Sequence, residues 1–81
     1  MLLLSPNPSW GAVSFTAGNH EGGLLEVFDL QGRLLWSRRL GAGELVPWDG
    51  VVNGAILPGG VYLARLTAGS RAEVVRWVRL R

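Results

Sequence analysis

Apolar and polar residues alternate along most of this chain, in short segments separated by glycine and proline. Residues 11–17 show the pattern well, because Val13 and Phe15 fall on one face of an extended segment and polar side chains on the other. This two-residue period is typical of a strand with one buried face. No stretch free of Gly and Pro shows the three- and four-residue spacing of an amphipathic helix. We therefore expect an all-β chain.

Six further segments have the length and pattern of strands. We expect Leu35 to be the core residue of the segment 33–40. Pro47 indicates an edge position or a place where strand pairing lapses, because proline donates no ladder hydrogen bond. The last segment changes phase near Trp77, which predicts a bulge or a strand crossing there. The six segments are residues 2–4, 24–30, 33–40, 45–48, 61–68 and 71–80.

Three of these segments have clear candidates for the core at alternate positions. These candidates are Leu25 and Val27, then Val46 and Trp48, then Tyr62, Ala64 and Leu66.

Turn residues lie between the predicted strands. Asp29 and Gly32 favour a tight hairpin, because Asp accepts turn hydrogen bonds and Gly adopts positive φ. Residues 68–70 predict a second hairpin, and residues 49–60 form the longest stretch expected to be irregular. Seven short strands joined in this way predict an immunoglobulin-like antiparallel β-sandwich. An OB-type barrel is the alternative, but such barrels usually carry a helix between strands.

Size and composition narrow the class of protein. The chain has 81 residues, 48% hydrophobic and 17% charged, which suits one small domain spanning residues 1–81. It has no cysteine, so thiolate metal sites and thiol nucleophiles are excluded. The apolar run at residues 2–4 is far shorter than a signal-peptide core or a membrane span. We expect no membrane insertion, and any export must be directed by something outside this chain or by the domain itself.

Charge adds little to this picture. The net charge is +2, and all eight basic residues are arginine. Only residues 76–81 combine arginines with an aromatic residue, and the rest of the chain is balanced in charge. Nucleic-acid binding needs a basic stripe with interleaved aromatics, so we expect none.

Residues with chemical potential are few. His20 lies in a predicted turn with no recognisable catalytic partners, and Asp49 with Asn53 lacks the ligand spacing of a calcium loop. We expect no enzyme activity, no metal and no cofactor. Four tryptophans leave a carbohydrate-binding module open, because sugars stack on flat aromatic faces. We expect Trp48 in the core, whereas the other three tryptophans could be exposed.

Four groups of residues match one family in order along the chain. They resemble the type A C-terminal sorting domains of the type IX secretion system and the similar FlgD-like immunoglobulin-fold modules. The chain departs from that pattern in closing with Arg where many sorting domains have Lys, and its WDG group is closer to the FlgD-like variant. The groups are LSPNP at 4–8, LEVFDLQGR at 25–33, WDG at 48–50 followed by PGGVY at 58–62, and RWVRLR at 76–81.

This resemblance implies a non-catalytic domain that directs a larger secreted protein to the surface of a Gram-negative bacterium by way of the periplasm. The implied partners are an upstream cargo domain, an outer-membrane translocon and a sortase, and the cargo is then attached to the surface or released. The alternative is a carbohydrate-binding or structural immunoglobulin-like accessory module of a secreted hydrolase. The implied recognition residues are Pro6, Asn7, Pro8, Arg76, Arg79 and Arg81, and the implied structural turn residues are Asp29, Gly32, Asp49, Gly50, Gly60 and Tyr62.

Overall fold

Nine strands make up the regular structure of the chain, in a computed structural model that describes residues 1–18 and 22–80. Every pairing between these nine strands is antiparallel, and the described residues contain no helix, so the all-β prediction is confirmed. None of the described residues therefore forms a helix long and apolar enough to cross a bilayer. The strands are β1 (Leu3–Ser5), β2 (Val13–Thr16), β3 (Gly23–Phe28), β4 (Leu34–Leu40), β5 (Leu45–Trp48), β6 (Val51–Val52), β7 (Ala55–Ile56), β8 (Gly60–Ala68) and β9 (Arg71–Arg79).

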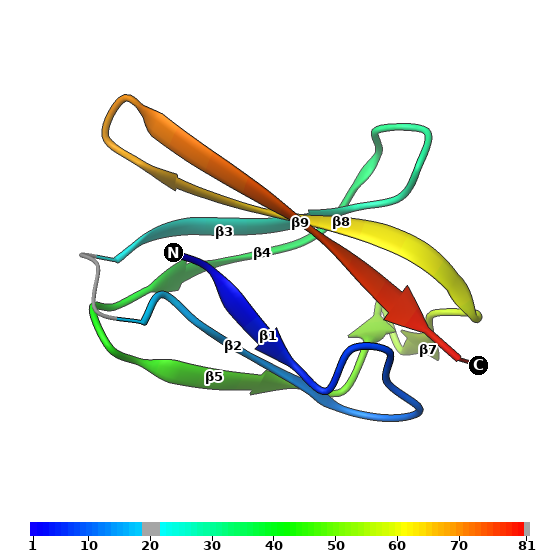
Figure 1. The fold of residues 1–81 in the computed structure, drawn as a ribbon. Coiled ribbons are helices and arrows are strands. Elements are labelled where there is room, and N and C mark those ends of the chain that lie inside the picture. Colours follow the sequence, from blue (N-terminus) through cyan, green and yellow to red (C-terminus); the bar gives the residue numbers. More distant parts are fainter. Residues whose placement is uncertain (19–21, 81) are drawn as a thin grey trace.

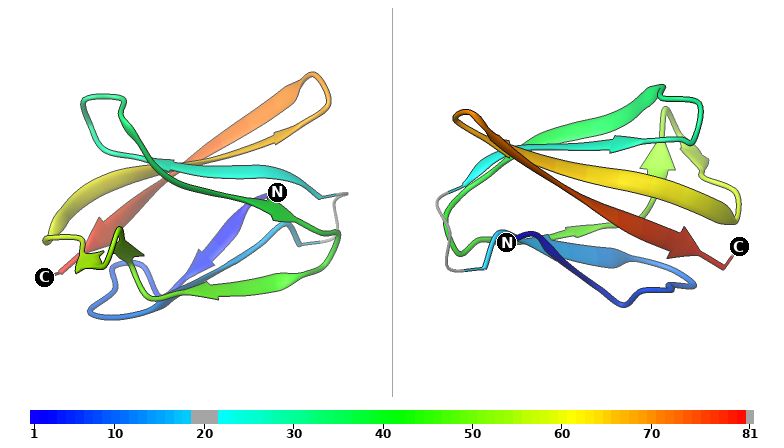
Figure 2. Two further views of the ribbon diagram at one scale, coloured as in Figure 1. Left: turned by 180° about the vertical axis from the view of Figure 1, so that it is seen from behind. Right: turned by 45° about the horizontal axis from the view of Figure 1, so that its top comes forward.

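Two open sheets face each other across the core (Figure 1). One has the strand order β1-β2-β5 and the other the order β4-β3-β8-β9. Figure 2 shows the two layers from behind and from above, with β9 passing close to the first part of the chain. A third, two-stranded sheet, β6-β7, lies within the stretch 49–60 that was expected to be irregular. The two strands of this hairpin bring the described strands to nine, where the sequence pattern predicts seven.

The core follows the alternation in the sequence. Inward positions on β2, β3, β5 and β8 are buried, as predicted, because neighbouring side chains on a strand point to opposite faces. Pro47 lies on β5, which is an edge strand, as expected. The buried hydrophobic residues are Leu2, Val13, Phe15, Ala17, Leu25, Val27, Leu40, Val46, Trp48, Tyr62, Ala64, Leu66 and Trp77.

Two predicted details are wrong. The buried residue of β4 is Leu40, while Leu35 is only half-buried, because the register between β3 and β4 shifts at Val27 and leaves Leu35 as the extra residue. The last strand has no irregularity in its pairing with β8. Instead Arg79 continues the inward face that Trp77 occupies, and Val78 simply points outward.

Aromatic side chains fill the space between the sheets. Trp77 is fully buried and meets Phe15 edge-on at a centroid distance of 6.5 Å. Trp36 and Trp48 stack with centroids 4.3 Å apart and planes 3° apart. These rings come from both sheets, and aromatic pairs of this geometry stabilise a core beyond the apolar area they bury.

Candidate recognition surface

Residues 6–9 form a segment, called the strap here, that lies along the outer edge of β9. The Asn7 side chain pairs with that edge as a peptide group would: Nδ2 donates to the Arg76 carbonyl at 2.8 Å, and Oδ1 accepts from the Val78 N–H at 2.9 Å. Pro6 and Pro8 on either side are exposed and have no N–H to satisfy. Asn7 and Arg76, predicted recognition residues from the two ends of the chain, therefore lie side by side.

Ser9 completes the strap. Its N–H donates to the Val78 carbonyl at 2.9 Å, and its carbonyl accepts from the Leu80 N–H at 2.7 Å. Its hydroxyl accepts from Trp77 Nε1 at 2.9 Å, and the residue is fully buried. The strap thus satisfies successive backbone groups of β9 on the side away from β8. The sequence pattern did not predict this role for Ser9, since an isolated Ser after the Pro-Asn-Pro sequence indicates only a turn.

The three arginines of the basic tail have different surroundings. Arg76 has an exposed side chain on β9, and Arg81 lies outside the described residues. Arg79 is only 4% exposed. Its Nε donates to the Leu57 carbonyl and its Nη1 to the Gly11 carbonyl, each at 3.0 Å, and its guanidinium lies 5.9 Å from the Trp77 ring centroid. From the interior, Arg79 therefore connects β9 with the loop at Leu57 and the loop at Gly11.

The turn after β5 makes room for this arginine. Gly50 adopts φ = +77°, and a Cβ on it would lie 2.7 Å from Arg79 Nη1. The Gly50 carbonyl accepts from the Leu57 N–H at 2.9 Å, and Asp49 Oδ1 accepts from the Val51 N–H at 3.0 Å. The WDG group is thus a turn built closely around a buried guanidinium.

The hairpin between β3 and β4 depends on one carboxylate. Asp29 Oδ1 accepts from the N–H groups of Gln31 and Arg33, each at 2.9 Å, and Oδ2 accepts from Arg33 Nε at 2.8 Å. The bond from the Arg33 backbone N–H is the main reason why the pKa of Asp29 is lowered from its ordinary value. Gly32 adopts φ = +86° in this turn. Asp29 is therefore ionised at neutral pH and organises the hairpin.

Tyr62 and Gly60 lie where β8 begins. The Tyr62 hydroxyl donates to the Pro58 carbonyl at 2.6 Å, and burial raises the pKa of this phenol above its ordinary value. Gly60 pairs with Arg79 across the β8-β9 ladder. Gly60 and Tyr62 thus hold the end of the loop in place. This loop contains Leu57, whose carbonyl accepts the hydrogen bond from Arg79.

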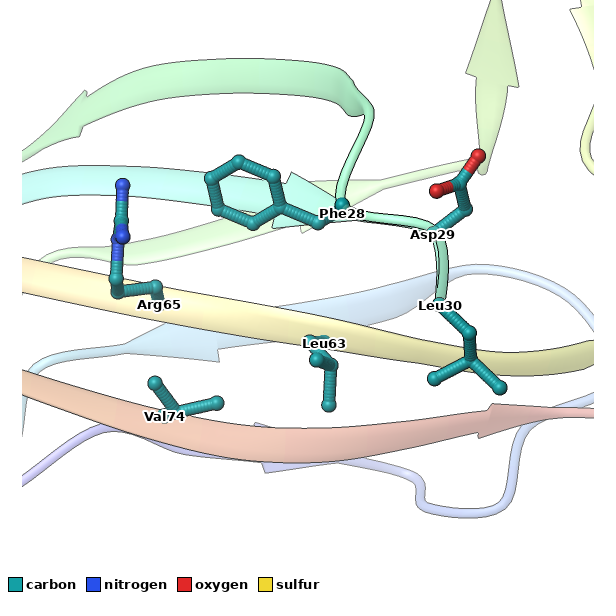
Figure 3. A pocket seen from close by; sticks show the side chains of 7 residues that line it. Phe28, Asp29, Leu30, Leu63, Arg65 and Val74 are labelled. Carbon is teal, nitrogen blue, oxygen red and sulfur yellow. The ribbon is translucent and has the colours of Figure 1, made fainter.

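A pocket of about 290 Å³ lies on the outer face of the four-stranded sheet (Figure 3). Arg65 is one of its lining residues, with its guanidinium 4.8 Å from the Phe28 ring centroid and its Nη2 2.8 Å from Glu26 Oε1. None of the sequence-based predictions above indicated this pocket. It is lined by Phe28, Asp29, Leu30, Gly32, Leu63, Arg65 and Val74.

Candidate metal ligands are scattered in the described part of the chain. Within residues 1–18 and 22–80, no three His, Cys, Asp or Glu residues gather closely enough to hold a metal ion. His20 lies outside the described residues. Asn53 adopts φ = 53° in the turn between β6 and β7, a conformation that Asn tolerates better than most residues.

The tryptophans do not form a flat exposed platform in the described part of the chain. Trp77 is buried, and Trp48 covers one face of the half-buried Trp36. Trp10, which is 67% exposed, stands apart on the loop after the strap. Sugar binding on paired coplanar rings therefore finds no support in this arrangement.

Comparison with known proteins gives one informative result. No family model matches the chain, and no curated protein matches its sequence. Its fold is similar to part of PorZ, an essential bacterial surface component of the type IX secretion system of human oral-microbiomic Porphyromonas gingivalis. The TM-score is 0.83 at 21% sequence identity, and the match covers 99% of this chain and 11% of PorZ. The chain thus shares its fold with a segment that is about a tenth of that protein.

Proposed function

We propose that this chain is a non-catalytic C-terminal sorting domain, with an immunoglobulin-like sandwich, that directs a larger protein through the type IX secretion system. The observation that carries the proposal is the fold similarity to PorZ across 99% of the chain, since PorZ is a surface component of that system. The four residue groups that resemble the sorting-domain family support it independently.

Three of those groups meet at one end of the molecule. The strap contains the proline-flanked Asn7, the WDG turn encloses Arg79, and the basic tail supplies Arg79 itself. Residues that resemble a linear signal are therefore parts of one folded surface. In the proposed mechanism an outer-membrane translocon recognises this folded surface. Within the described part of the basic tail, Arg76 is the exposed arginine that can contact the translocon.

The remaining parts of the proposal follow from the same assignment. An upstream cargo domain precedes the module in the native polypeptide, a sortase acts on the exported protein, and the cargo ends at the cell surface or outside the cell. The domain contributes only binding surface, so specificity resides in its edges, loops and exposed arginines.

A reporter assay tests this function. Residues 1–81 are fused behind a periplasmic reporter in a bacterium that has the type IX system, and surface exposure is measured by protease accessibility in intact cells. We expect surface delivery in this strain and periplasmic retention in a matched strain without the translocon. Periplasmic retention of a soluble, folded fusion in the competent strain would refute the proposal.

Charge reversal refines the assay. We expect Arg76→Glu to reduce surface delivery, because it removes the exposed basic group next to the strap. Arg71→Glu makes the same change in charge at the far, exposed end of β9 and is the control. Equal delivery of the two variants would show that Arg76 takes no part in recognition.

A further inference from the structure

The edges of the two sheets differ in how well they are covered. An edge strand presents unpaired N–H and C=O groups, which pair readily with another extended chain. The strap already occupies these groups on the second half of β9, through Asn7 and Ser9. Beside the first half, Glu73 Oε1 accepts from the Leu2 N–H at 2.8 Å, so the beginning of the chain lies there. The second half of β9 is therefore closed to strand addition, and the remaining edge at residues 71–75 is shorter than β4.

The edges of the three-stranded sheet are protected in other ways. β5 has four residues, one of which is the exposed Pro47, and a proline cannot donate to an added strand. β1 has only three residues, and short edge strands offer few consecutive groups for pairing. Neither strand is a good template for a partner.

β4 is different. It has seven residues without proline or glycine, and among the described residues β3 is its only neighbouring strand. In the view from behind in Figure 2, β4 runs along the near side of the molecule. It is therefore the longest uncovered strand edge of the described chain.

The side chains of β4 select the kind of strand that can pair with it. Arg38 and Arg39 are exposed, and Arg38 holds Glu44 in a salt bridge with a distance of 3.0 Å. Two copies of β4 side by side would bring these arginines against each other, and like charges on adjacent strands destabilise the pair. An acidic strand beside β4 would instead form favourable ion pairs with Arg38 and Arg39. The 52% exposed Leu34 offers an apolar contact at the other end of β4.

We propose that the edge of β4 is the docking surface for an extended acidic strand of a partner protein. The partner strand adds to the four-stranded sheet beyond β4. Its acidic side chains lie beside Arg38 and Arg39, and an apolar side chain lies beside Leu34. Main-chain hydrogen bonds supply affinity and the alternating side chains supply specificity, as in other cases of strand addition. The inference goes beyond the proposed function, because β4 lies at the opposite edge of the sheet from β9 and the strap and is a second binding surface. Only the partner's identity rests on the proposed function.

Arg38 and Arg39 point to opposite faces of β4, so two adjacent acidic residues are needed to meet both. The probe is a synthetic seven-residue peptide of Val with two adjacent Glu residues (the Glu peptide), and the control has Lys at those two positions (the Lys peptide). Titration of the ¹⁵N-labelled domain is followed by amide chemical shifts. We expect saturable binding of the Glu peptide, with the shifts confined to β4 and its flanking turns. Binding of both peptides alike, shifts centred on β9 or β5, or no saturable binding would overturn the proposal.

Charge-reversal variants test the side-chain part. We expect Arg38→Glu and Arg39→Glu each to weaken binding of the Glu peptide by about fivefold, as for exposed ion pairs, and to allow the Lys peptide to bind. Arg71→Glu carries the same charge change away from β4 and retains wild-type affinity for the Glu peptide. Dispersed amide spectra establish that each variant is folded, and loss of affinity in the Arg71 variant alone would contradict the assignment.

The peptide and reporter assays separate the two proposals. Peptide binding at β4 with a reporter retained in the periplasm supports this docking surface and refutes the sorting function. Surface delivery that is unchanged by Arg38→Glu and Arg39→Glu, together with no peptide binding, supports sorting and refutes this docking surface.

Discussion

Arg79 shows how one arginine in a basic tail becomes part of the interior. Its guanidinium satisfies two backbone carbonyls from loops that are far apart in sequence, those of Gly11 and Leu57. Arginine suits this position because its fork of donors reaches two acceptors at once and is weakly hydrated. A residue that resembles part of a recognition signal is thus placed to hold the surface together.

Replacing Arg79 with Met should therefore destabilise the domain. The variant keeps much of the side-chain volume but leaves the Gly11 and Leu57 carbonyls without their donor, a loss of about 2–3 kcal/mol in the free energy of unfolding. Urea denaturation measures it. Arg76→Met, on the exposed face of the same strand, should change the same quantity by less than about 0.5 kcal/mol. Equal losses in the two variants would contradict the role of Arg79.

Gly50 should tolerate no side chain. Ala at this position meets Arg79 Nη1 at 2.7 Å in addition to the strain of φ = +77°. Gly32→Ala is the matched control, because its φ is +86° but no atom lies within 4 Å of the added Cβ. We expect thermal unfolding to show a loss of about 1 kcal/mol for Gly32→Ala and a clearly larger loss for Gly50→Ala. Equal losses would mean that the Arg79 side chain moves aside freely.

Asp29 should make the stability of the domain depend on pH at the acidic end. The pKa of this carboxyl is lowered in the folded protein, mainly by the bond from the Arg33 N–H. Its contribution is thus complete above the unfolded pKa of about 3.9 and is lost as the pH falls from there through the folded pKa. Asp29→Asn should reduce stability slightly at pH 7 and flatten the decline below about pH 4. Urea denaturation across this range measures it, and identical pH profiles for variant and wild type would contradict this role.

At the scale of elements, local patterns predicted more than long-range ones. The alternation in β2 and β8 and the hairpin turn at Asp29 depend on neighbouring residues, and the structure has them where the sequence placed them. The strap depends on residues 68–71 positions away, through Asn7 and Ser9. The β6-β7 hairpin was missed because a two-residue strand is too short to show a period.

The strap provides the prediction at this scale. Asn7→Ala removes the bonds to the Arg76 carbonyl and the Val78 N–H, each worth about 0.5–1.5 kcal/mol. We expect faster amide hydrogen exchange at Val78, while Leu80 stays protected by Ser9. Asn7→Asp keeps the acceptor and should preserve protection at Val78. Unchanged exchange in the Ala variant would show that the strap holds β9 without Asn7.

At the scale of the whole molecule, the aromatic residues decide how the two sheets meet. The pattern placed Trp48 in the core but left Trp36 and Trp77 open, because alternation indicates which face a residue is on and not which face is covered. Arg79 on the same face as Trp77 obscured that face further. The site residues were brought together in the same way, by contacts between chain ends that no local pattern contains.

Trp77 should therefore be the most sensitive core position. Trp77→Leu leaves a cavity among Phe15, Trp48 and Tyr62, and also leaves the Ser9 hydroxyl without its donor. We expect a loss of about 3 kcal/mol or more, a large part of the total for a domain of this size. Differential scanning calorimetry measures it. Trp10→Leu, at a 67% exposed position, should leave the melting temperature nearly unchanged, and a comparable loss there would contradict the described core.

The hydrogen bonds between the strap and β9 have a consequence for biosynthesis. During translation the first nine residues leave the ribosome long before residues 76–80, which carry the groups that Asn7 and Ser9 bind. Until then the strap lacks its partner strand, although β1 already has β2 to pair with, and closing so long a loop is among the slow steps of folding. A chain that stops before residue 76 lacks the backbone groups that the strap binds, so it cannot complete the fold. A completely folded domain therefore shows that translation has continued through these residues.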